Sequence, residues 1–278
     1  NTDNAIDREF QPSYIRGGTA PAASAAAHYN TSNFMSWLAE NTLTYKKKIG
    51  GKHNIEAFVG YTAQKVTYEN SGINGSQFLD DNIQWLNVAA TRIGNVGASD
   101  FSLISYVGRL NYNFENKYLI SFAFRKDGSS KFGTNNKYGT FPSVSAGWIV
   151  SDEKFMQNVQ KINFLKIRGS YGKVGNNNIG DYTYLAGINQ NNYVFNNQLS
   201  SGSSLNGIGN ANLTWETTSG YDIGLDMGLF DGRLSFTYDY YWKKTDGLLY
   251  GIDIPVKSGF YNITSNIGRF DFWGHEFS

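Results

Sequence analysis

The sequence predicts an all-β protein, an antiparallel transmembrane β-barrel, on the basis of three observations. Apolar and aromatic residues alternate with polar ones over segments of about ten residues, which is the length of a membrane-spanning strand. The connections between these segments are short and long in turn. Charged residues make up only 17% of the chain and aromatic residues 16%, whereas a soluble domain usually carries about 25% charged residues.

The clearest alternation lies in residues 234–243, where one face of the predicted strand is entirely apolar or aromatic. That face comprises Leu234, Phe236, Tyr238, Tyr240 and Trp242, opposed by Ser235, Thr237, Asp239, Tyr241 and Lys243. The same period predicts strands at residues 106–114, 118–125, 165–173 and 221–229, and less regularly at 37–45, 55–63 and 142–150. We expect about ten strands, each able to supply the 9 to 11 residues that a tilted membrane strand requires.

The connections distinguish a membrane barrel from a soluble sheet. Short links are expected at residues 50–52, 113–117, 151–163 and 230–233. Long polar loops are expected at residues 17–33, 70–102, 128–138, 174–212 and 246–261. An outer-membrane barrel has short periplasmic turns and long extracellular loops, so every second connection should be long. A compact soluble domain should not need several irregular loops of more than about 15 residues.

This direction places Asp127, Lys173 and Asp246 near the outer rim, and Gly51 and Asp231 at the periplasmic rim. Aromatic residues then gather near the strand ends. Phe114 and Tyr118 are expected near the periplasmic rim, and Tyr240, Tyr241 and Trp242 near the outer rim. Rings with one apolar and one polar edge favour the membrane interface.

Composition excludes several other classes of function. There is no apolar run of about 18 residues for a membrane helix, and a net charge of +1 gives no basic face for nucleic acid. The chain has no cysteine, and its three histidines, His28, His53 and His275, have neither metal-binding spacing nor a recognisable catalytic partner. We therefore expect no enzyme activity, no metal and no cofactor. Asp152 and Glu153 are interpreted as carboxylates at the start of a helical turn.

Several consecutive motifs closely resemble those of the SusC/RagA-type TonB-dependent transporters. Their order and spacing match that family from about residue 40 to the C-terminus. The motifs are SYVGRLNY at 105–112, KYL at 117–119, RKDGSSKFG at 125–133, FPSVSAGW at 141–148, SDEKFM at 151–156, LKIRGSYG at 165–172 with GN at 175–176, and NLTWETT at 212–218.

The resemblance implies that residues 1–278 are part of a 22-stranded barrel in the bacterial outer membrane, in contact with its lipid. It also implies an N-terminal plug, a segment that contacts the TonB complex and a SusD-like surface lipoprotein as a lid. We expect the chain to be a piece of such a barrel, truncated at both ends and without the plug. The function implied is TonB-energised uptake of oligosaccharides or peptides.

Two groups of candidate functional residues follow. Trp85 and Phe78 in one loop, and Tyr193 and Phe195 in another, are candidates for contact with a glycan or peptide substrate; packing between loops or against the lid remains the alternative. The residues expected to face the lumen are Arg109, Arg168, Asp222, Asp226 and Asp239. Two rival functions stay open, an independent small outer-membrane barrel acting as a porin or surface hydrolase, and a soluble carbohydrate-binding β-sandwich.

Overall fold

The computed structural model describes residues 1–13, 25–159 and 161–278. Ten long strands form one antiparallel sheet in the order β1-β2-β3-β4-β5-β6-β7-β12-β13-β14. Their bounds are β1 Thr2–Gln11, β2 Ala26–Ile49, β3 His53–Ser76, β4 Thr91–Phe114, β5 Tyr118–Ser129, β6 Tyr138–Ile149, β7 Ile162–Asn176, β12 Glu216–Leu229, β13 Leu234–Asp253 and β14 Asn262–Phe277. The prediction of an all-β antiparallel fold of about ten strands is confirmed.

The remaining elements are short. Strands β8 (Ile188–Gln190) and β11 (Ser203–Leu205) pair with each other, as do β9 (Tyr193–Phe195) and β10 (Gln198–Ser200). The described residues also form four 3-10 turns, η1 (Leu86–Val88), η2 (Val150–Asp152), η3 (Lys154–Met156) and η4 (Val256–Ser258). In the described part of the chain no helix is long and apolar enough to cross a membrane.

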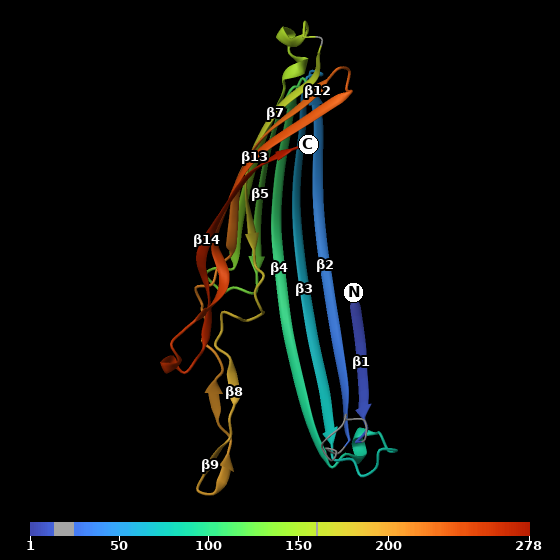
Figure 1. Ribbon diagram of the computed structural model, residues 1–278, viewed down its shortest axis with the longest axis vertical. Coiled ribbons are helices and arrows are strands. Elements are labelled where there is room, and N and C mark those ends of the chain that lie inside the picture. The colour runs from blue at the N-terminus through green and yellow to red at the C-terminus, as the bar shows by residue number, and fades with distance from the viewer. Residues whose placement is uncertain (14–24, 160) are drawn as a thin grey trace. The chain divides into compact units, whose positions relative to one another are not determined.

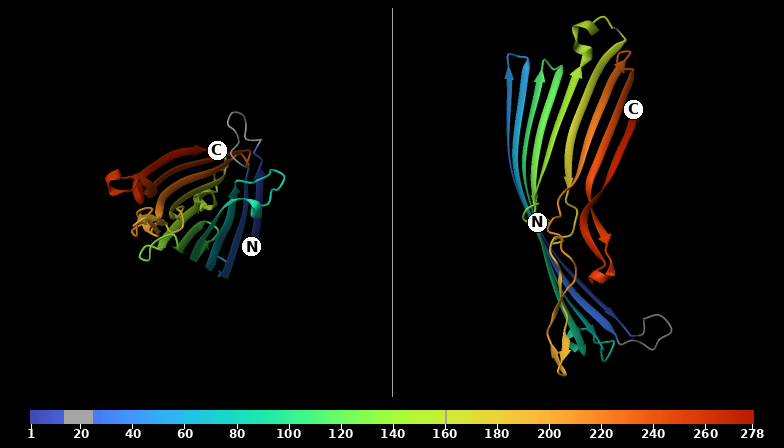
Figure 2. Two further views of the ribbon diagram at one scale, coloured as in Figure 1. Left: turned by 90° about the horizontal axis from the view of Figure 1, so that it is seen from below. Right: turned by 90° about the vertical axis from the view of Figure 1, so that its left-hand side faces the viewer.

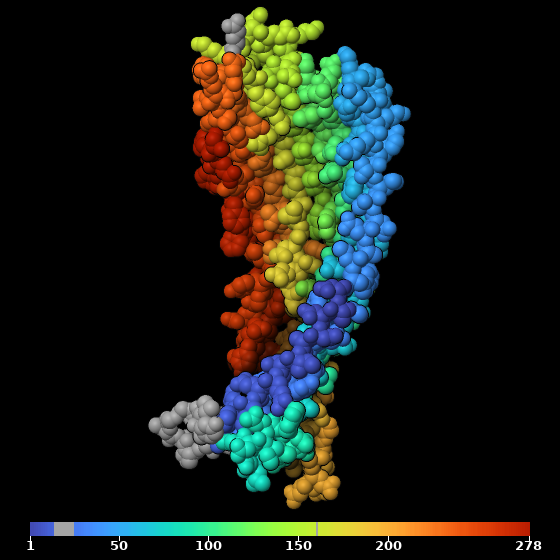
Figure 3. Space-filling model, turned by 90° about the vertical axis from the view of Figure 1, so that its right-hand side faces the viewer, coloured from blue at the N-terminus to red at the C-terminus, as the bar shows by residue number. Residues whose placement is uncertain are grey.

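The chain divides into two compact units, which we describe separately. Unit 1 comprises Asn1–Ala39 and Gln64–Ser102, and unit 2 comprises Glu40–Ala63 and Leu103–Ser278. Figure 1 shows the strands of unit 2 running side by side from the green β4 to the red β14. Across the upper half of the space-filling view the colours follow the same order, from blue through green and yellow to orange and red (Figure 3).

Strand register in unit 2 places the apolar positions of neighbouring strands on one common face. Tyr221 pairs with Trp242 and Ile223 with Tyr240 across β12 and β13, and the same face continues through the other strands. Its further pairs are Tyr118 with Trp148 and Phe122 with Val144 between β5 and β6, and Leu110 with Phe122 between β4 and β5. Most of these side chains are exposed. A soluble sandwich would bury such a face against a second sheet, and the described residues contain none that covers it.

Tight turns at one end of the sheet follow from local sequence. Gly50 and Gly51 both have a positive φ, of 57° and 74°, as a two-residue hairpin turn requires. Asp231 also has a positive φ, of 57°, and its turn is held because Asp231 N donates to Asn163 Oδ1 at 2.6 Å. These turns lie at the same end of the strands of unit 2 (Figure 2).

The bounds predicted for three of the five long loops, at residues 17–33, 70–102 and 246–261, are wrong, because the strands there are longer than the sequence pattern suggested. The loops predicted at residues 128–138 and 174–212 agree with the structure to within three residues at each end. Strands β2, β3 and β4 have 24 residues each and include much of the segments expected to be loops, while residues 17–24 of the first expected loop lie outside the described residues. Outside the hydrocarbon layer of the membrane both faces of a strand meet water. The hydrogen bonding between strands therefore continues there without an alternation of apolar and polar residues. Connection lengths consequently do not alternate strictly: residues 150–161, at the short-turn end, outnumber residues 130–137 at the other.

The described residues form two small apolar cores near the ends of the strands. In unit 1, Phe78, Ala25, Ala27 and Ala89 are buried together. In unit 2 the buried cluster consists of Phe132, Phe141, Leu213 and Trp215. Most side chains of the sheet itself are not buried in either core, which is expected where lipid rather than protein covers the apolar face.

Candidate functional site

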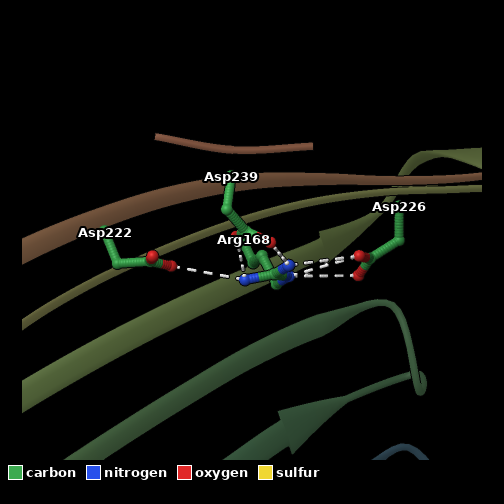
Figure 4. Close-up of polar contacts among 4 residues, drawn as sticks. All are labelled: Arg168, Asp222, Asp226 and Asp239. Carbon is green, nitrogen blue, oxygen red and sulfur yellow. Dashed lines mark hydrogen bonds and ion pairs between the residues drawn. The ribbon is translucent and has the colours of Figure 1, made fainter. Parts of the chain in front are cut away.

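A charged cluster occupies the face of unit 2 opposite the aromatic one. Arg168 of β7 lies at its centre, surrounded by Asp222 and Asp226 of β12 and Asp239 of β13 (Figure 4). Its Nη1 is 3.3 Å from Asp222 Oδ1 and 2.6 Å from Asp239 Oδ1, and its Nε is 3.2 Å from Asp226 Oδ2. Four of the five residues expected to face the lumen are thus brought together.

Register explains why the cluster forms. Arg168 is opposite Gly224, and Gly224 is in turn opposite Asp239. A Cβ on Gly224 would collide with the Arg168 guanidinium and with Asp239, so glycine lets the arginine lie flat across β12. The side chains remain 16–36% exposed, and each contact by itself is therefore of modest strength.

Arg109, the fifth residue, belongs to a separate polar group on β3 and β4. Its Nη2 is 3.7 Å from Glu56 Oε1, and its guanidinium lies 5.5 Å from the ring centroid of Phe58. Glu56 also pairs with Lys46 of β2, at 3.0 Å. That either polar group faces a lumen stays a prediction.

Both polar groups border one hollow of about 690 Å³ within unit 2. Its charged lining residues are Lys46, Lys47, Lys48, Glu56, Lys166, Arg168 and Asp222. Between these lie small hydroxyl and amide side chains together with apolar ones such as Ile55, Leu119 and Ile120, so the hollow has a mixed lining of which more is apolar than polar.

The loop aromatics of unit 1 have different environments. Trp85 is exposed, with the Arg8 guanidinium 3.9 Å from the centroid of its ring. Phe78 is only 9% exposed and packs edge-on against Phe10 at a centroid distance of 5.2 Å. Because Phe78 is part of the core of unit 1, its ring has no free face for a substrate, and loop packing is the better interpretation.

The loop aromatics of unit 2 lie on an exposed β-ribbon. Tyr193 and Phe195 are 70% and 71% exposed and, being two positions apart on β9, point to the same side. Figure 2 shows this amber ribbon, β8 to β11, extending beyond the ends of β7 and β12. Residues 182–215, which include it, contain no Asp, Glu, Lys, Arg or His.

The ribbon is anchored by residues that sequence reasoning did not single out. Phe132 and Leu213 are fully buried, and Trp215 Nε1 donates to the Lys137 carbonyl oxygen at 3.0 Å. Cβ atoms at Gly139 or Gly175 would collide with the Phe141 ring. The sequence signal that could have identified these anchor residues is the presence of large apolar side chains within otherwise polar segments.

Glu153 differs from its expected role at the start of a helical turn. Its side chain caps neither 3-10 turn; Oε1 instead accepts hydrogen bonds from Tyr118 Oη at 2.6 Å and Trp148 Nε1 at 3.2 Å. These bonds, the first of them most, hold the pKa of Glu153 below its usual range. The carboxylate therefore fixes two rings at the short-turn end of the sheet.

No group of three or more His, Asp or Glu side chains in the described ranges is arranged to hold a metal ion.

Comparison with known proteins places these features in a family. The family description "TonB dependent receptor-like, beta-barrel" matches residues 2–278. "TonB-dependent receptor P3" of Formosa agariphila is 36% identical over 100% of this chain and 28% of its own length. "TonB-dependent receptor SusC" of Bacteroides thetaiotaomicron is 38% identical over 87% of this chain and 24% of its own. The chain thus spans about a quarter of the length of these relatives.

A solved structure agrees. The structure titled "Structure of the RagAB peptide transporter" superposes with a TM-score of 0.89 at 28% identity, over 99% of this chain and 30% of that one.

Proposed function

The chain belongs to the TonB-dependent receptor β-barrel family, and from that premise we propose that it forms part of the wall of a TonB-energised nutrient importer of the SusC/RagA type. As a member of this family it is a segment of an outer-membrane β-barrel. The import activity, the cargo and the partners of the whole receptor are the proposal.

One observation carries the proposal. A single antiparallel sheet has an exposed, ring-bearing face on one side and ionised side chains on the other. Along β4, Tyr106 and Phe114 are separated by about 26 Å at about 3.3 Å per residue, or about 20 Å in height for a strand tilted by about 40°. That is close to the apolar band of about 25 Å that such barrels present to lipid.

The lumen is proposed to lie on the side of Arg168, Asp222, Asp226, Asp239 and Arg109. A polar wall suits this role because passage of a hydrophilic cargo requires groups that replace its water. No covalent step is needed, so we propose that the protein is not an enzyme and that energy arrives from the TonB complex through a receptor segment outside residues 1–278.

The cargo is proposed to be a glycan or a peptide. One matched structure is titled a peptide transporter, and the exposed rings of Tyr193, Phe195 and Trp85 suit both classes, since they can stack on sugars or cover apolar side chains. We also propose a SusD-like surface lipoprotein as the lid, which the charge-free ribbon of residues 182–215 could contact.

Two measurements test the proposal with the full-length receptor. The receptor should fractionate with the outer membrane and migrate faster on a gel before boiling than after it. Cells that lack the receptor, or that lack TonB, should fail to grow on the cargo, and plasmid-borne receptor should restore growth only where TonB is present. Growth that is independent of TonB would indicate a passive pore instead.

A further inference from the structure

A shallow groove of about 610 Å³ lies on the aromatic face of unit 2 and crosses β3 to β6 as far as β7. Leu110 is opposite Phe122, and Phe122 is opposite Val144, so one row of apolar side chains runs across it. Arg109 and Ser143 also border it, from positions whose side chains point to the other face. We call this hollow the outer groove. The side chains that line it from the aromatic face include Ala57, Val59, Leu110, Phe122, Phe124 and Val144.

A glycine opens the floor of the outer groove. Gly108 of β4 lines it, and a Cβ added there would meet no atom within 4 Å. Phe124, which is directly opposite Gly108 in the sheet, therefore does not reach over it. Gly108 also lacks a positive φ, so the backbone does not require glycine at this position. Open apolar space on a face that meets lipid suits an acyl chain, because the chain covers the surrounding apolar side chains.

Two lysines stand at the end of the outer groove that is nearer the long loops. Lys126 follows Phe124 by two positions on β5, and Lys173 follows Tyr171 by two positions on β7, so both belong to the aromatic face. Since β6 separates β5 from β7, the two lysines lie roughly 12 Å apart at about 4.8 Å between neighbouring strands. The Nζ of Lys126 lies 5.1 Å from the ring centroid of Tyr138. Both side chains are long enough to reach a single head group between them.

These two lysines differ from other cations of the same face. Lys244 on β13 and Arg269 on β14 both pair with Asp246, at 2.8 and 3.9 Å. Neither Lys126 nor Lys173 is in an ion pair with a carboxylate of the described residues. Two ammonium groups are therefore available to an anion from outside the sheet, and basic residues at a membrane boundary attract anionic lipid head groups.

We propose that the outer groove binds a molecule of lipopolysaccharide, with an acyl chain over Gly108 and a head-group phosphate paired with Lys126 and Lys173. The inference goes beyond the proposed function, because it concerns the lipid side of the wall and requires neither cargo nor TonB. The tight turns of unit 2 mark the periplasmic end of the strands, and the lysines lie toward the other end, which selects the outer leaflet. Lys126 is opposite Tyr106, at the outer limit of the apolar band, where phosphates begin. Bonds from an ammonium group to phosphate are about twice as strong as bonds between neutral groups.

Lipid binding to the full-length receptor tests the proposal. Receptor purified in detergent without cargo is titrated with lipopolysaccharide, and native mass spectrometry counts the lipid molecules that it holds. In the variant K126Q/K173Q one site should bind about 30-fold more weakly, because each lysine near a lipid head group contributes about a factor of five. The variant K126R/K173R keeps both charges and should retain the site. Lipopolysaccharide stripped of its phosphates should bind the wild type as weakly as intact lipid binds K126Q/K173Q.

Two further variants separate the groove from the charge. Gly108→Leu fills the open space without removing a cation, and it should weaken the same site while the receptor still migrates as a folded barrel on a gel before boiling. The control K257Q removes a lysine from η4, which is not part of the outer groove, and should leave the site unchanged.

The outcomes that contradict the proposal are distinct. Equal binding by the wild type and K126Q/K173Q would overturn the phosphate contact, and equal binding by the wild type and Gly108→Leu would overturn the position of the acyl chain. Phosphatidylglycerol that binds as tightly as lipopolysaccharide would refute the assignment to the outer leaflet. Import is measured separately in cells, so loss of this site and failure of the importer give different results.

Discussion

Leu110→Arg should be strongly destabilising if the aromatic face of the sheet meets lipid. Leu110 lies halfway along β4 between Tyr106 and Phe114, whose rings contact Tyr61 and Tyr118, and it is therefore near the middle of the apolar band. It is 44% exposed in the structure, so lipid covers somewhat less than half of its surface.

The magnitude has two parts. Moving that share of a leucine from lipid to a polar setting forfeits about 1 kcal/mol, because full burial of the side chain contributes about 1.5–3 kcal/mol. An arginine facing lipid at the midplane of a barrel costs about 2–4 kcal/mol more. The sum is a loss of about 3–5 kcal/mol in the free energy of unfolding.

Leu199→Arg is the matched control. Leu199 is also a leucine and is 71% exposed, but it lies on the outer ribbon, where water surrounds it, so the change should stay within about 0.5 kcal/mol. The assay is equilibrium unfolding of the full-length receptor from lipid vesicles in urea, followed by tryptophan fluorescence. Equal midpoints for the two variants would refute a lipid-facing surface at Leu110.

Three further predictions concern the polar cluster, the loop anchor and the short-turn end. Arg168→Ala should lower stability by about 1–3 kcal/mol, because it leaves three adjacent aspartates without their cation, while Arg168→Lys should recover only part of the loss; the measurement is again urea unfolding. Leu213→Ala removes a fully buried side chain and should cost about 2–5 kcal/mol locally, seen as faster protease cleavage within residues 182–215 at unchanged barrel stability. The lowered pKa of Glu153 means that its stabilising bonds exist above the ordinary carboxyl range and are lost as the pH falls through the folded-state pKa, so acidification should change Trp148 fluorescence in the wild type but not in Glu153→Gln.

The face of the sheet to which each side chain points was predictable from the sequence, because successive residues of a strand point to opposite faces. Asp222, Asp226 and Asp239 share a face with Arg168 once the register is antiparallel and the turns are tight, and these turns are marked by Gly50, Gly51 and Asp231. The meeting of these side chains at one guanidinium was not predictable, since it depends on the stagger between three strands and on the space above Gly224.

Loop packing was beyond the sequence for a different reason. Phe78 and Trp85 are equivalent in type and lie in one polar segment, yet one is buried against Phe10 and the other is exposed. Both rings lie against β1, Phe78 on Phe10 and Trp85 beside Arg8. The outcome therefore depends on which residue of that distant strand each ring meets, and alternation carries no information on that. The true ends of the strands were missed for a related reason. Where both faces of a strand are exposed to water, its sequence is polar throughout and resembles that of a loop.

The absence of Asp, Glu, Lys, Arg and His from residues 182–215 has a bearing on the environments in which the protein can work. Dissolved ions screen only charges, so whatever the rings and amides of the ribbon hold should be held as firmly in brine as in dilute medium, and across the neutral and mildly acidic range. Ion pairs on the charged face of the sheet, such as that of Lys46 with Glu56, should by contrast weaken as the ionic strength rises. The contacts of residues 182–215 and the ion pairs of the sheet would then respond differently to the salt concentration of the medium.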